Sequence, residues 1–248
     1  MSQIKNYTVF ETKQDLYAFI AHELKRYSLM PSEQHICLSG GSTPKGLFAY
    51  ILAHDYMHTI QWHNLHFWWG DERCVPSDSS QSNYGEAMRL LFSHIDIKAA
   101  NIHSINIVEG KDKISLKNFS DEMYALLPQK NNYPSFDWVF LGLGDDGHTA
   151  SLFPNVSNLD AQESAVLVLK PDTDEYRISL SANTLRAAKR ISYLVSGSSK
   201  SKVVKEILTN QLVSENYPAA LISSELGQTE YLLDQQAGSL LQIRGSCQ

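Results

Sequence analysis

The stretch FDWVFLGLGDDGHTASLFP, residues 136–154, contains both a predicted strand and a glycine pattern that bears on the fold. Its first six residues form an apolar run that is typical of a buried β-strand. Gly142, Gly144 and Gly147 then make a literal G-x-G-x-x-G, the spacing that dinucleotide-binding proteins use between a strand and a helix. The pattern therefore poses a choice between a nucleotide site and a turn that presents other chemistry.

The residues around the last glycine argue against a nucleotide. A dinucleotide fingerprint leads into a long helix, whereas Pro154 limits any helix that starts after Gly147 to a short one. Asp145 and Asp146 would also repel a pyrophosphate. The same turn is suited to presenting the imidazole of His148 at a cleft, with a carboxylate nearby to orient it. We therefore expect no nucleotide cofactor, and a catalytic role for His148 with Asp146 beside it.

The chain outward from this stretch alternates apolar runs with amphipathic segments, which predicts an α/β fold with a largely parallel sheet flanked by helices. No linker interrupts the pattern, so we expect one domain over residues 1–248. A helix that starts within 40–53 has Ser42 or Thr43 as its predicted cap. The predicted strands are 35–39, 65–70, 136–144, 165–169, 177–181, 191–197, 218–223 and 231–234, and the other predicted helices are 12–29, 82–92, 116–128 and 198–208.

Composition excludes several classes of protein. Lys and Arg total 21 against 27 Asp and Glu, a net charge of -6, which does not provide the basic face of a nucleic-acid-binding protein. Three cysteines share no metal or redox spacing, and the first residues lack the apolar core of a signal peptide. No apolar run is long enough to span a membrane. These features predict a cytoplasmic protein without nucleic-acid or membrane partners, and no obligatory protein partner is inferred.

Unusual residues follow four of the predicted strands, at the edge where open parallel sheets bind ligands. SGGST (39–43) brings two glycines to a helix start, and GDER (70–73) places three charges after a tryptophan-rich strand. SGSSKSK (196–202) puts Lys200 in the first turn of a helix, where a bound anion would offset its unfavourable position. Taken singly, each stretch is also explained by a capped turn, a local ion pair or a solvated lysine.

A possible metal site competes with this interpretation. Four histidines lie close in sequence, and the first two have the i, i+4 spacing of one helix face; they are His54, His58, His63 and His66. No cysteine or glutamate completes the set, and His66 opens a predicted strand that separates it from the helix. We therefore expect no metal.

Three stretches in this order, LSGGSTP (38–44), GDERCVPSDSSQSN (70–83) and GLGDDGHTASLFP (142–154), resemble the 6-phosphogluconolactonase family. The last two are long and specific, and the resemblance extends over nearly the whole chain. It implies a Rossmann-like fold similar to that of glucosamine-6-phosphate deaminase. It also implies hydrolysis of 6-phospho-D-glucono-1,5-lactone to 6-phosphogluconate, the second step of the oxidative pentose phosphate pathway, without a metal or nucleotide.

The resemblance also implies roles for particular residues. His148 matches the proposed catalytic base, and Asp71 and Arg73 match a substrate-contacting pair. The loop beside the sugar phosphate and the basic residues near it correspond to Gly40, Gly41, Ser42, Arg177 and Lys200. If His148 were not the base, Asp71 would be the next candidate. Two alternatives stay open: a glucosamine-6-phosphate deaminase or isomerase, and a non-catalytic sugar-phosphate-binding domain.

Overall fold

The computed structural model describes residues 5–156, 159–209 and 216–241. Its centre is a seven-stranded sheet in the order β1-β12-β11-β8-β2-β3-β5, and every neighbouring pair in it is parallel. The strands are β1 (Asn6–Phe10), β2 (Gln34–Leu38), β3 (Leu65–Trp69), β5 (Ile102–His103), β8 (Trp138–Leu141), β11 (Arg190–Val195) and β12 (Gln228–Asp234). This arrangement confirms the predicted α/β fold with a largely parallel sheet.

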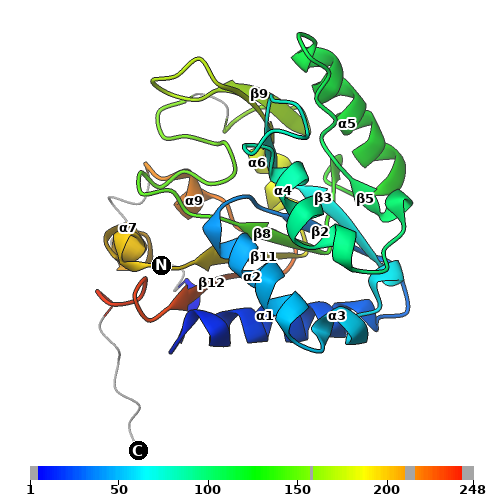
Figure 1. The fold of residues 1–248 in the computed structure, drawn as a ribbon. Coiled ribbons are helices and arrows are strands. Elements are labelled where there is room, and N and C mark those ends of the chain that lie inside the picture. The colour runs from blue at the N-terminus through cyan, green and yellow to red at the C-terminus, as the bar shows by residue number, and fades with distance from the viewer. Residues whose placement is uncertain (1–4, 157–158, 210–215, 242–248) are drawn as a thin grey trace, which may run out of the picture.

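Helices cover both faces of the sheet, and Figure 1 shows α1 (Lys13–Ser28), α2 (Ser42–Ala53) and α3 (Tyr56–Thr59) on one side of it. On the other side lie α5 (Asp112–Leu126), α6 (Ala182–Arg186) and α9 (Pro218–Leu221). The chain also forms α4 (Asn83–Leu90) and α7 (Ser201–Thr209). With helices on both faces, the central strands become buried on both sides, which explains why they read as continuous apolar runs.

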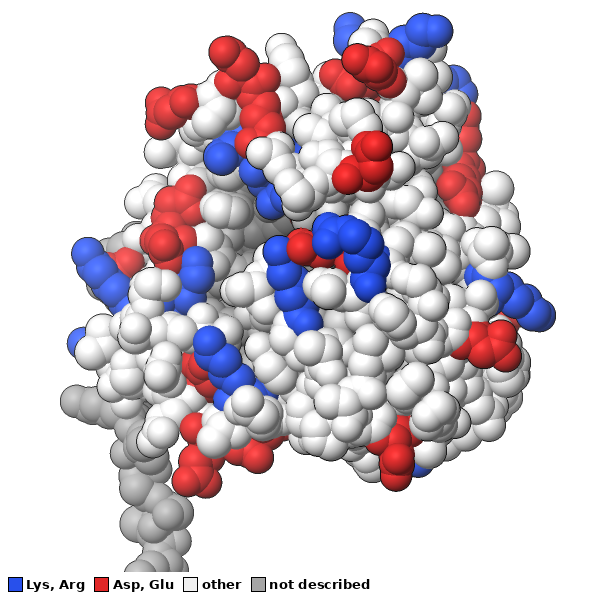
Figure 2. All heavy atoms as spheres, in the orientation of Figure 1, with Lys and Arg blue, Asp and Glu red and all other residues white. Residues whose placement is uncertain are grey.

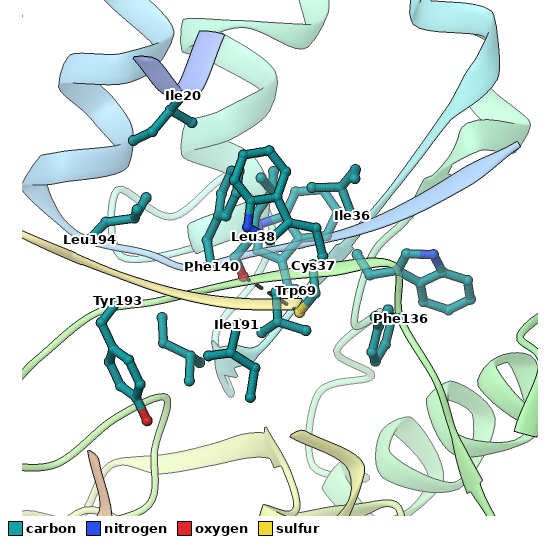
Figure 3. Close-up of a cluster of buried hydrophobic side chains, with 14 of the residues drawn as sticks. Ile20, Ile36, Cys37, Leu38, Trp69, Phe136, Phe140, Ile191, Tyr193 and Leu194 are labelled. Carbon is teal, nitrogen blue, oxygen red and sulfur yellow. Dashed lines mark hydrogen bonds between the residues drawn. The ribbon is translucent and has the colours of Figure 1, made fainter. Parts of the chain in front are cut away.

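The core lies between these layers and is rich in aromatic side chains. Trp69, Phe136, Phe140 and Tyr193 are all at most 1% exposed, and Figure 3 shows them packed with aliphatic residues of neighbouring strands. Large buried rings contribute much of the hydrophobic free energy of folding, at about 25 cal/mol per Å² of apolar surface removed from water. The core therefore holds rigidly the strands whose ends carry the polar loops.

A second, three-stranded antiparallel sheet stands apart from the first, in the order β4-β10-β9. Its strands are β4 (Asp71–Arg73), β10 (Tyr176–Leu180) and β9 (Ala165–Leu169). The sequence predicted the last two as strands without separating them from the main sheet, because periodicity does not reveal the pairing partner. A two-stranded pair, β6 (Gln129–Lys130) and β7 (Tyr133–Pro134), completes the strands.

Two local predictions need correction, and one strand was not predicted. Residues 218–223 were predicted as a strand, but Pro218–Leu221 form α9, with Pro218 in the first turn that suits it. The helix α2 begins at Ser42 after Gly41, so neither Ser42 nor Thr43 is its cap. The edge strand β1 was not predicted. Its side chains are largely exposed, whereas the strands that are recognisable in the sequence are apolar runs that become buried. In contrast, Ser82 caps α4 as one of the two predicted alternatives.

Candidate active site

A cavity lies at the point in the sheet where the order in which strands are added reverses. From β2 the chain adds β3 and β5 on one side, and then returns to place β8 on the other side of β2. Ligands of open parallel sheets bind at such switch points, beyond the carboxyl ends of the strands. A cavity of about 240 Å³ is present here, between the loops that follow Leu38 and Leu141. The face drawn in Figure 2 is hollowed near its middle, with basic side chains gathered at the rim.

The cavity brings together nearly all of the residues predicted for the site. Its wall includes Gly40, Gly41, Ser42, Asp71, Arg73, His148, Arg177 and Lys200. Asp146 does not line the cavity, but its carboxylate contacts the Nδ1 atom of His148. These residues come from five separate segments of the chain, so the fold assembles them; no single stretch does so.

The first of these segments is the Gly40–Gly41 turn between β2 and α2. Gly41 has φ +101, a conformation that favours glycine, and a Cβ atom at Gly40 would come within 2.1 Å of the Asn83 side chain. No side chain of the described residues caps the start of α2. The helix start therefore faces the cavity with main-chain N–H groups, an arrangement that suits an anion.

The Gly142–Gly147 segment folds back on itself and does not lead into a helix. The Gly144 N–H donates to the His148 carbonyl at 2.9 Å, and the Gly147 N–H donates to the Gly144 carbonyl at 3.1 Å. Residues 148–153 continue as a turn closed by the Thr149–Leu152 bridge. Without a helix after the last glycine, this turn lacks the N-terminus on which a dinucleotide fingerprint holds its pyrophosphate.

His148 projects from this turn and is oriented by Asp146. Its Nδ1 lies 2.6 Å from the Asp146 Oδ1, and its ring packs against Phe153 at 4.9 Å between centroids. Burial raises the pKa of Asp146, but hydrogen bonds from the His148 main chain and ring outweigh it, so the net pKa is lowered. An ionised carboxylate only accepts, so Nδ1 carries the proton and Nε2 keeps a free lone pair. The pair is thus prepared to take up a proton at Nε2.

Strand alternation explains the different directions of the three charges in β4. Asp71 and Arg73 are two residues apart and share a face, which lines the cavity. Glu72 points away and accepts hydrogen bonds from the Ser82 hydroxyl and from the Asn83 and Tyr84 N–H groups. Burial raises the pKa of Glu72 despite these bonds. Glu72 therefore anchors the start of α4 and takes no part in the cavity.

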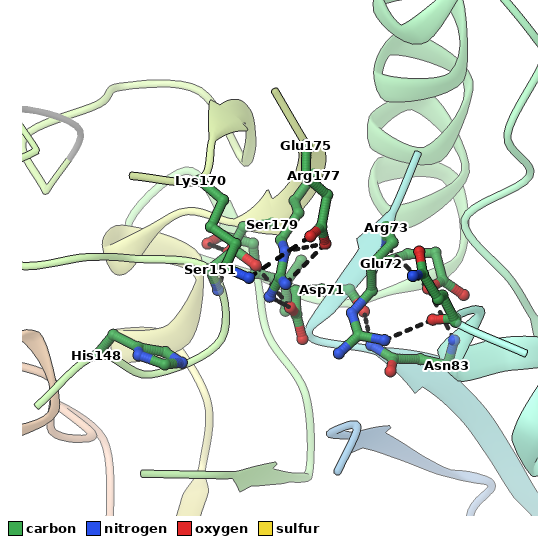
Figure 4. A network of polar contacts seen from close by, with 12 residues as sticks. Asp71, Glu72, Arg73, Asn83, His148, Ser151, Lys170, Glu175, Arg177 and Ser179 are labelled. Carbon is green, nitrogen blue, oxygen red and sulfur yellow. Dashed lines mark hydrogen bonds and ion pairs between the residues drawn. The ribbon is translucent and has the colours of Figure 1, made fainter. Parts of the chain in front are cut away.

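Asp71 belongs to a buried network that links β4 to the His148 turn. Its Oδ2 accepts a hydrogen bond from the Ser151 hydroxyl at 2.6 Å, and Arg177 Nη1 lies 3.9 Å from the same oxygen. Arg177 also pairs with Glu175, through Nε at 2.9 Å and Nη2 at 2.7 Å. In Figure 4 the imidazole of His148 extends toward the side on which these groups gather.

Two arginines stand opposite each other in the cavity wall. Arg73 and Arg177 are paired across β4 and β10, a placement in which like charges repel. Glu175 and Asp71 offset the charge of Arg177, while Arg73 donates to the Gln81 carbonyl through Nη1. Among the described residues, the buried Nε of Arg73 has no hydrogen-bond partner. An anionic ligand in the cavity would offset the repulsion between the two guanidinium groups.

Lys200 reaches the cavity from the 3-10 turn Ser198–Lys200 that precedes α7. Its Nζ lies 2.8 Å from the Asp145 Oδ1, so the lysine is paired to the turn that carries His148. The predicted strand-to-helix turn with Lys200 in its first residues is therefore present.

Sequence reasoning missed several polar residues of the cavity. Ser39 lines it with a buried hydroxyl that has no partner within the described part of the chain. The Thr43 and Ser196 hydroxyls lie 3.1 Å apart and join the first turn of α2 to the loop after β11. Ser151 lies within the motif GLGDDGHTASLFP, but nothing in the sequence predicts a role for it. A lone Ser or Thr near a strand end gives no signal of this kind, because its partner depends on which strands are neighbours.

The histidines considered for a metal lie in separate elements. His54 follows α2 and stacks on Tyr50, and His66 lies in β3, where it contacts His103. His58 and His63 lie in α3 and in the 3-10 turn Trp62–Asn64. Within residues 5–156, 159–209 and 216–241, no group of three or more His, Cys, Asp or Glu is arranged to hold a metal ion. Over the same ranges, no helix combines the length and apolarity that crossing a membrane requires.

Comparison with known proteins defines the class. The family of glucosamine-6-phosphate isomerases and 6-phosphogluconolactonases matches residues 9–231. A Haemophilus influenzae protein named 6-phosphogluconolactonase is 47% identical over 236 residues, which cover 95% of this chain and 100% of that protein. The chain therefore belongs to the family of glucosamine-6-phosphate isomerases and 6-phosphogluconolactonases.

Solved structures agree with this assignment. The crystal structure of a protein called devB has a TM-score of 0.92 at 44% identity and covers 96% of this chain and 99% of its own. A monomeric glucosamine-6-phosphate deaminase has a TM-score of 0.80 at 20% identity, with 95% and 99% covered. The second likeness concerns the fold alone, and it confirms the predicted similarity to glucosamine-6-phosphate deaminase.

Proposed function

We propose that this chain is a 6-phosphogluconolactonase, a carboxylic ester hydrolase that converts 6-phospho-D-glucono-1,5-lactone to 6-phospho-D-gluconate. The name of the Haemophilus influenzae relative supports this reaction, since the two proteins match over nearly their full lengths. The observation that carries the proposal is the His148–Asp146 pair at a cavity whose wall holds Arg73, Arg177 and Lys200. A proton acceptor and several cations in one cavity suit an ester that bears a phosphate.

His148 is the general base in this proposal. A lactone is a cyclic ester, so a water must lose a proton as its oxygen forms a bond to C1. The Nε2 atom takes that proton, while Asp146 holds Nδ1–H and stabilises the imidazolium that results. When the C1–ring oxygen bond breaks, the same proton passes from Nε2 to the departing oxygen. The products are a carboxylate, after loss of its acidic proton, and a free hydroxyl.

Arg73 is the side chain that we assign to the developing oxyanion. Negative charge builds on the carbonyl oxygen of C1 in the transition state, and preorganised donors stabilise it most when water is excluded. Arg73 lines the cavity, and the Gln81 carbonyl is the one hydrogen-bond partner of its guanidinium among the described residues, so the group keeps donors for an oxyanion. Asp71 stands beside it as an acceptor suited to a sugar hydroxyl, with its Oδ2 already held by Ser151.

The phosphate end of the substrate is assigned to the Gly40–Gly41–Ser42 turn, with Lys200 and Arg177 as cations. The main-chain N–H groups at the start of α2 and the Lys200 ammonium border the same cavity. Binding energy at this remote group orients C1 against His148 and contributes to the rate without touching the reacting bond.

Parallel assays with two substrates test the reaction. Purified protein is given freshly prepared lactone at pH 6.5, where spontaneous hydrolysis is slow, and loss of the lactone is compared with an enzyme-free control. In a second assay it is given glucosamine 6-phosphate, and ammonia release is measured. We expect catalysed lactone hydrolysis, insensitive to EDTA, and no ammonia. Ammonia release without lactone hydrolysis would replace the proposal with the deaminase alternative, and neither activity would favour a binding domain.

Cytoplasmic location, the lack of an obligatory protein partner and a single domain over residues 1–248 stay predictions. Cys37 and Cys74 are free thiols, which is compatible with a reducing cytoplasm. The lactone is a small molecule that the cavity can accept without a protein partner, and single-domain behaviour over residues 1–248 is testable by one cooperative unfolding transition.

A further inference from the structure

Two consecutive carboxylates on the catalytic turn point to different partners. Asp146 contacts the ring of His148, whereas Asp145 pairs with the Lys200 ammonium at 2.8 Å. Lys200 lines the cavity and its side chain is 25% exposed, while Asp145 lies outside the wall with a side chain that is 67% exposed. Among the described residues Lys200 is the only lysine in the wall, and it is thus already paired with an acid that the reaction does not use.

A phosphate that enters the cavity must share this ammonium with Asp145. Oxygens of both groups would then lie on the same Nζ, within about 5 Å of each other if each keeps hydrogen-bond distance. A carboxylate and a phosphate dianion at that separation repel, although the exposure of Asp145 to solvent screens much of the repulsion. The geometry therefore sets the two anions in competition for one cation.

We propose that Asp145 is a built-in competitor for Lys200, which occupies the ammonium when the cavity is empty and weakens the binding of phosphorylated ligands. This inference deepens the proposed function and rests on it for the identity of the ligand. Substrate and product of the lactonase reaction carry the same phosphate, so a site that bound it too tightly would retain its product. Asp145 then limits product inhibition by keeping the phosphate subsite partly neutralised.

A purely structural role for the same ion pair makes the opposite prediction. If Asp145 served only to tether the His148 turn to the helix start, its loss would loosen the turn, lower kcat and leave phosphate affinity unchanged or weaker. Competition instead predicts tighter phosphate binding, a lower KM and stronger inhibition by the product. The substitution Asp145→Asn separates the two, because asparagine keeps a hydrogen-bonding group of the same size and removes only the charge.

Calorimetric titration with inorganic phosphate is the primary test. We expect Asp145→Asn to lower the Kd for phosphate about three- to fivefold relative to wild type, in line with a solvent-screened pair. Lys200→Ala should raise that Kd tenfold or more, since the cation itself is lost. The matched control is Asp121→Asn, which removes the same charge from an exposed pair with Lys117 on α5, a helix that contributes nothing to the cavity wall. The control should bind phosphate as wild type does.

Kinetics with the lactone supply the second readout. The KM and the inhibition constant of 6-phosphogluconate should fall together in Asp145→Asn, by the same factor as the phosphate Kd. An unchanged or higher phosphate Kd in Asp145→Asn, wild-type binding by Lys200→Ala, or an equal gain in Asp121→Asn would each overturn the inference. So would a lack of phosphate binding in both wild type and Asp145→Asn. If the titrations behave as expected but no lactone is hydrolysed, the proposed reaction fails while the competition for Lys200 stands.

Discussion

Histidines lie toward both ends of the parallel sheet, and the two groups differ in what surrounds them. At the carboxyl ends, His148 has one nitrogen held by Asp146 and the other free beside a cavity. Toward the amino ends, His35 accepts a hydrogen bond from the Trp68 indole at 3.1 Å, and His66 lies 2.9 Å from His103. Residue type alone thus does not make a catalytic site, because His148 presents its second nitrogen to a cavity, whereas His35 and His66 each have one ring nitrogen in contact with another buried side chain.

The burial of the second group has a consequence for its ionisation. Burial, followed by the neighbouring His66, lowers the pKa of His35 to about 4. The pKa of His66 is also lowered, again chiefly by burial and then by His103. These rings are therefore neutral parts of the packed structure, and they are unsuited to take up protons near neutral pH.

The largest expected effect is loss of catalysis when the first group is broken. His148→Ala should lower kcat by 10²–10⁴-fold, about 3–5 kcal/mol of transition-state stabilisation, because the general base is gone. KM should change little, since the phosphate contacts lie elsewhere. Steady-state kinetics on the folded variant provide the measurement, with His66→Asn as the matched control at the other end of the sheet. A His148→Ala enzyme with more than half of the wild-type kcat would transfer the role of base to Asp71.

A smaller effect is expected from removal of the Lys200 cation, which lies at the same carboxyl edge of the sheet as His148. Lys200→Ala should raise KM by roughly 10- to 100-fold and leave kcat nearly unchanged, because a charge-assisted contact is worth about 1.5–3 kcal/mol. The measurement is KM and kcat with the phosphorylated lactone, and Lys117→Ala on α5 serves as the control for loss of one positive charge. A drop in kcat at unchanged KM would assign Lys200 to the reacting carbon instead of the phosphate.

Protonation of His35, toward the amino ends of the strands, should lower the stability of the protein and leave catalysis unaffected. The folded pKa of His35 is about 4, below the unfolded value of about 6.5, so the folded state disfavours the protonated ring. Its contribution to stability is thus complete above about pH 6.5 and is lost as the pH falls from there toward 4. Because the ring is half-buried, we expect the loss to reach about 2 kcal/mol, after allowance for solvent.

Urea denaturation at pH 7 and pH 5 measures this loss, with His35→Gln as the comparison. The variant should lose less stability than wild type over the same interval, because part of the titration is removed while the rest of the protein titrates as before. An identical pH dependence in both proteins would show that His35 does not titrate in this range.

The smallest effect is expected from a residue that lies at the carboxyl edge of the sheet but outside the cavity. Thr12 follows β1 at that edge, and it forms a capping box with Asp15 at the start of α1. Thr12→Ala should cost about 1 kcal/mol of unfolding free energy and leave kcat and KM unchanged, since no residue of α1 lines the cavity. Thermal unfolding and steady-state kinetics test both halves. An altered kcat would mean that the edge strand influences the site.

Much of the fold could be predicted because local patterns determine it. Apolar runs at β2, β3, β8 and β11 and the polar stretches after them predict correctly that the cavity residues lie at one edge of the sheet. The loops carry specific motifs, so His148, Arg73 and Lys200 could be named from sequence. Their roles in catalysis and binding stay predictions.

The misses have two physical causes: one run is too short to show a period, and the others depend on partners distant in sequence. The run PAALIS is too short for its periodicity to separate helix from strand, and the position of Pro218 in a first turn decides it. The assignment of β9 and β10 to a second sheet depends on the pairing of β10 with β4, about a hundred residues earlier in the chain. The same is true of Ser151, whose hydrogen bond to Asp71 joins the His148 turn to β4, and of the Thr43–Ser196 contact.

The three glycines of the G-x-G-x-x-G pattern are under unequal steric constraint, which affects how the gene for this protein can change. Every missense change of a glycine codon adds a Cβ atom, and at Gly144 that atom would lie 2.1 Å from the His148 ring. At Gly147, where φ is +83, it would lie 2.2 Å from Tyr217. Around Gly142, by contrast, none of the described residues comes within 4 Å of such an atom. Mutational scanning should therefore find position 142 tolerant of alanine and serine, and positions 144 and 147 closed to both.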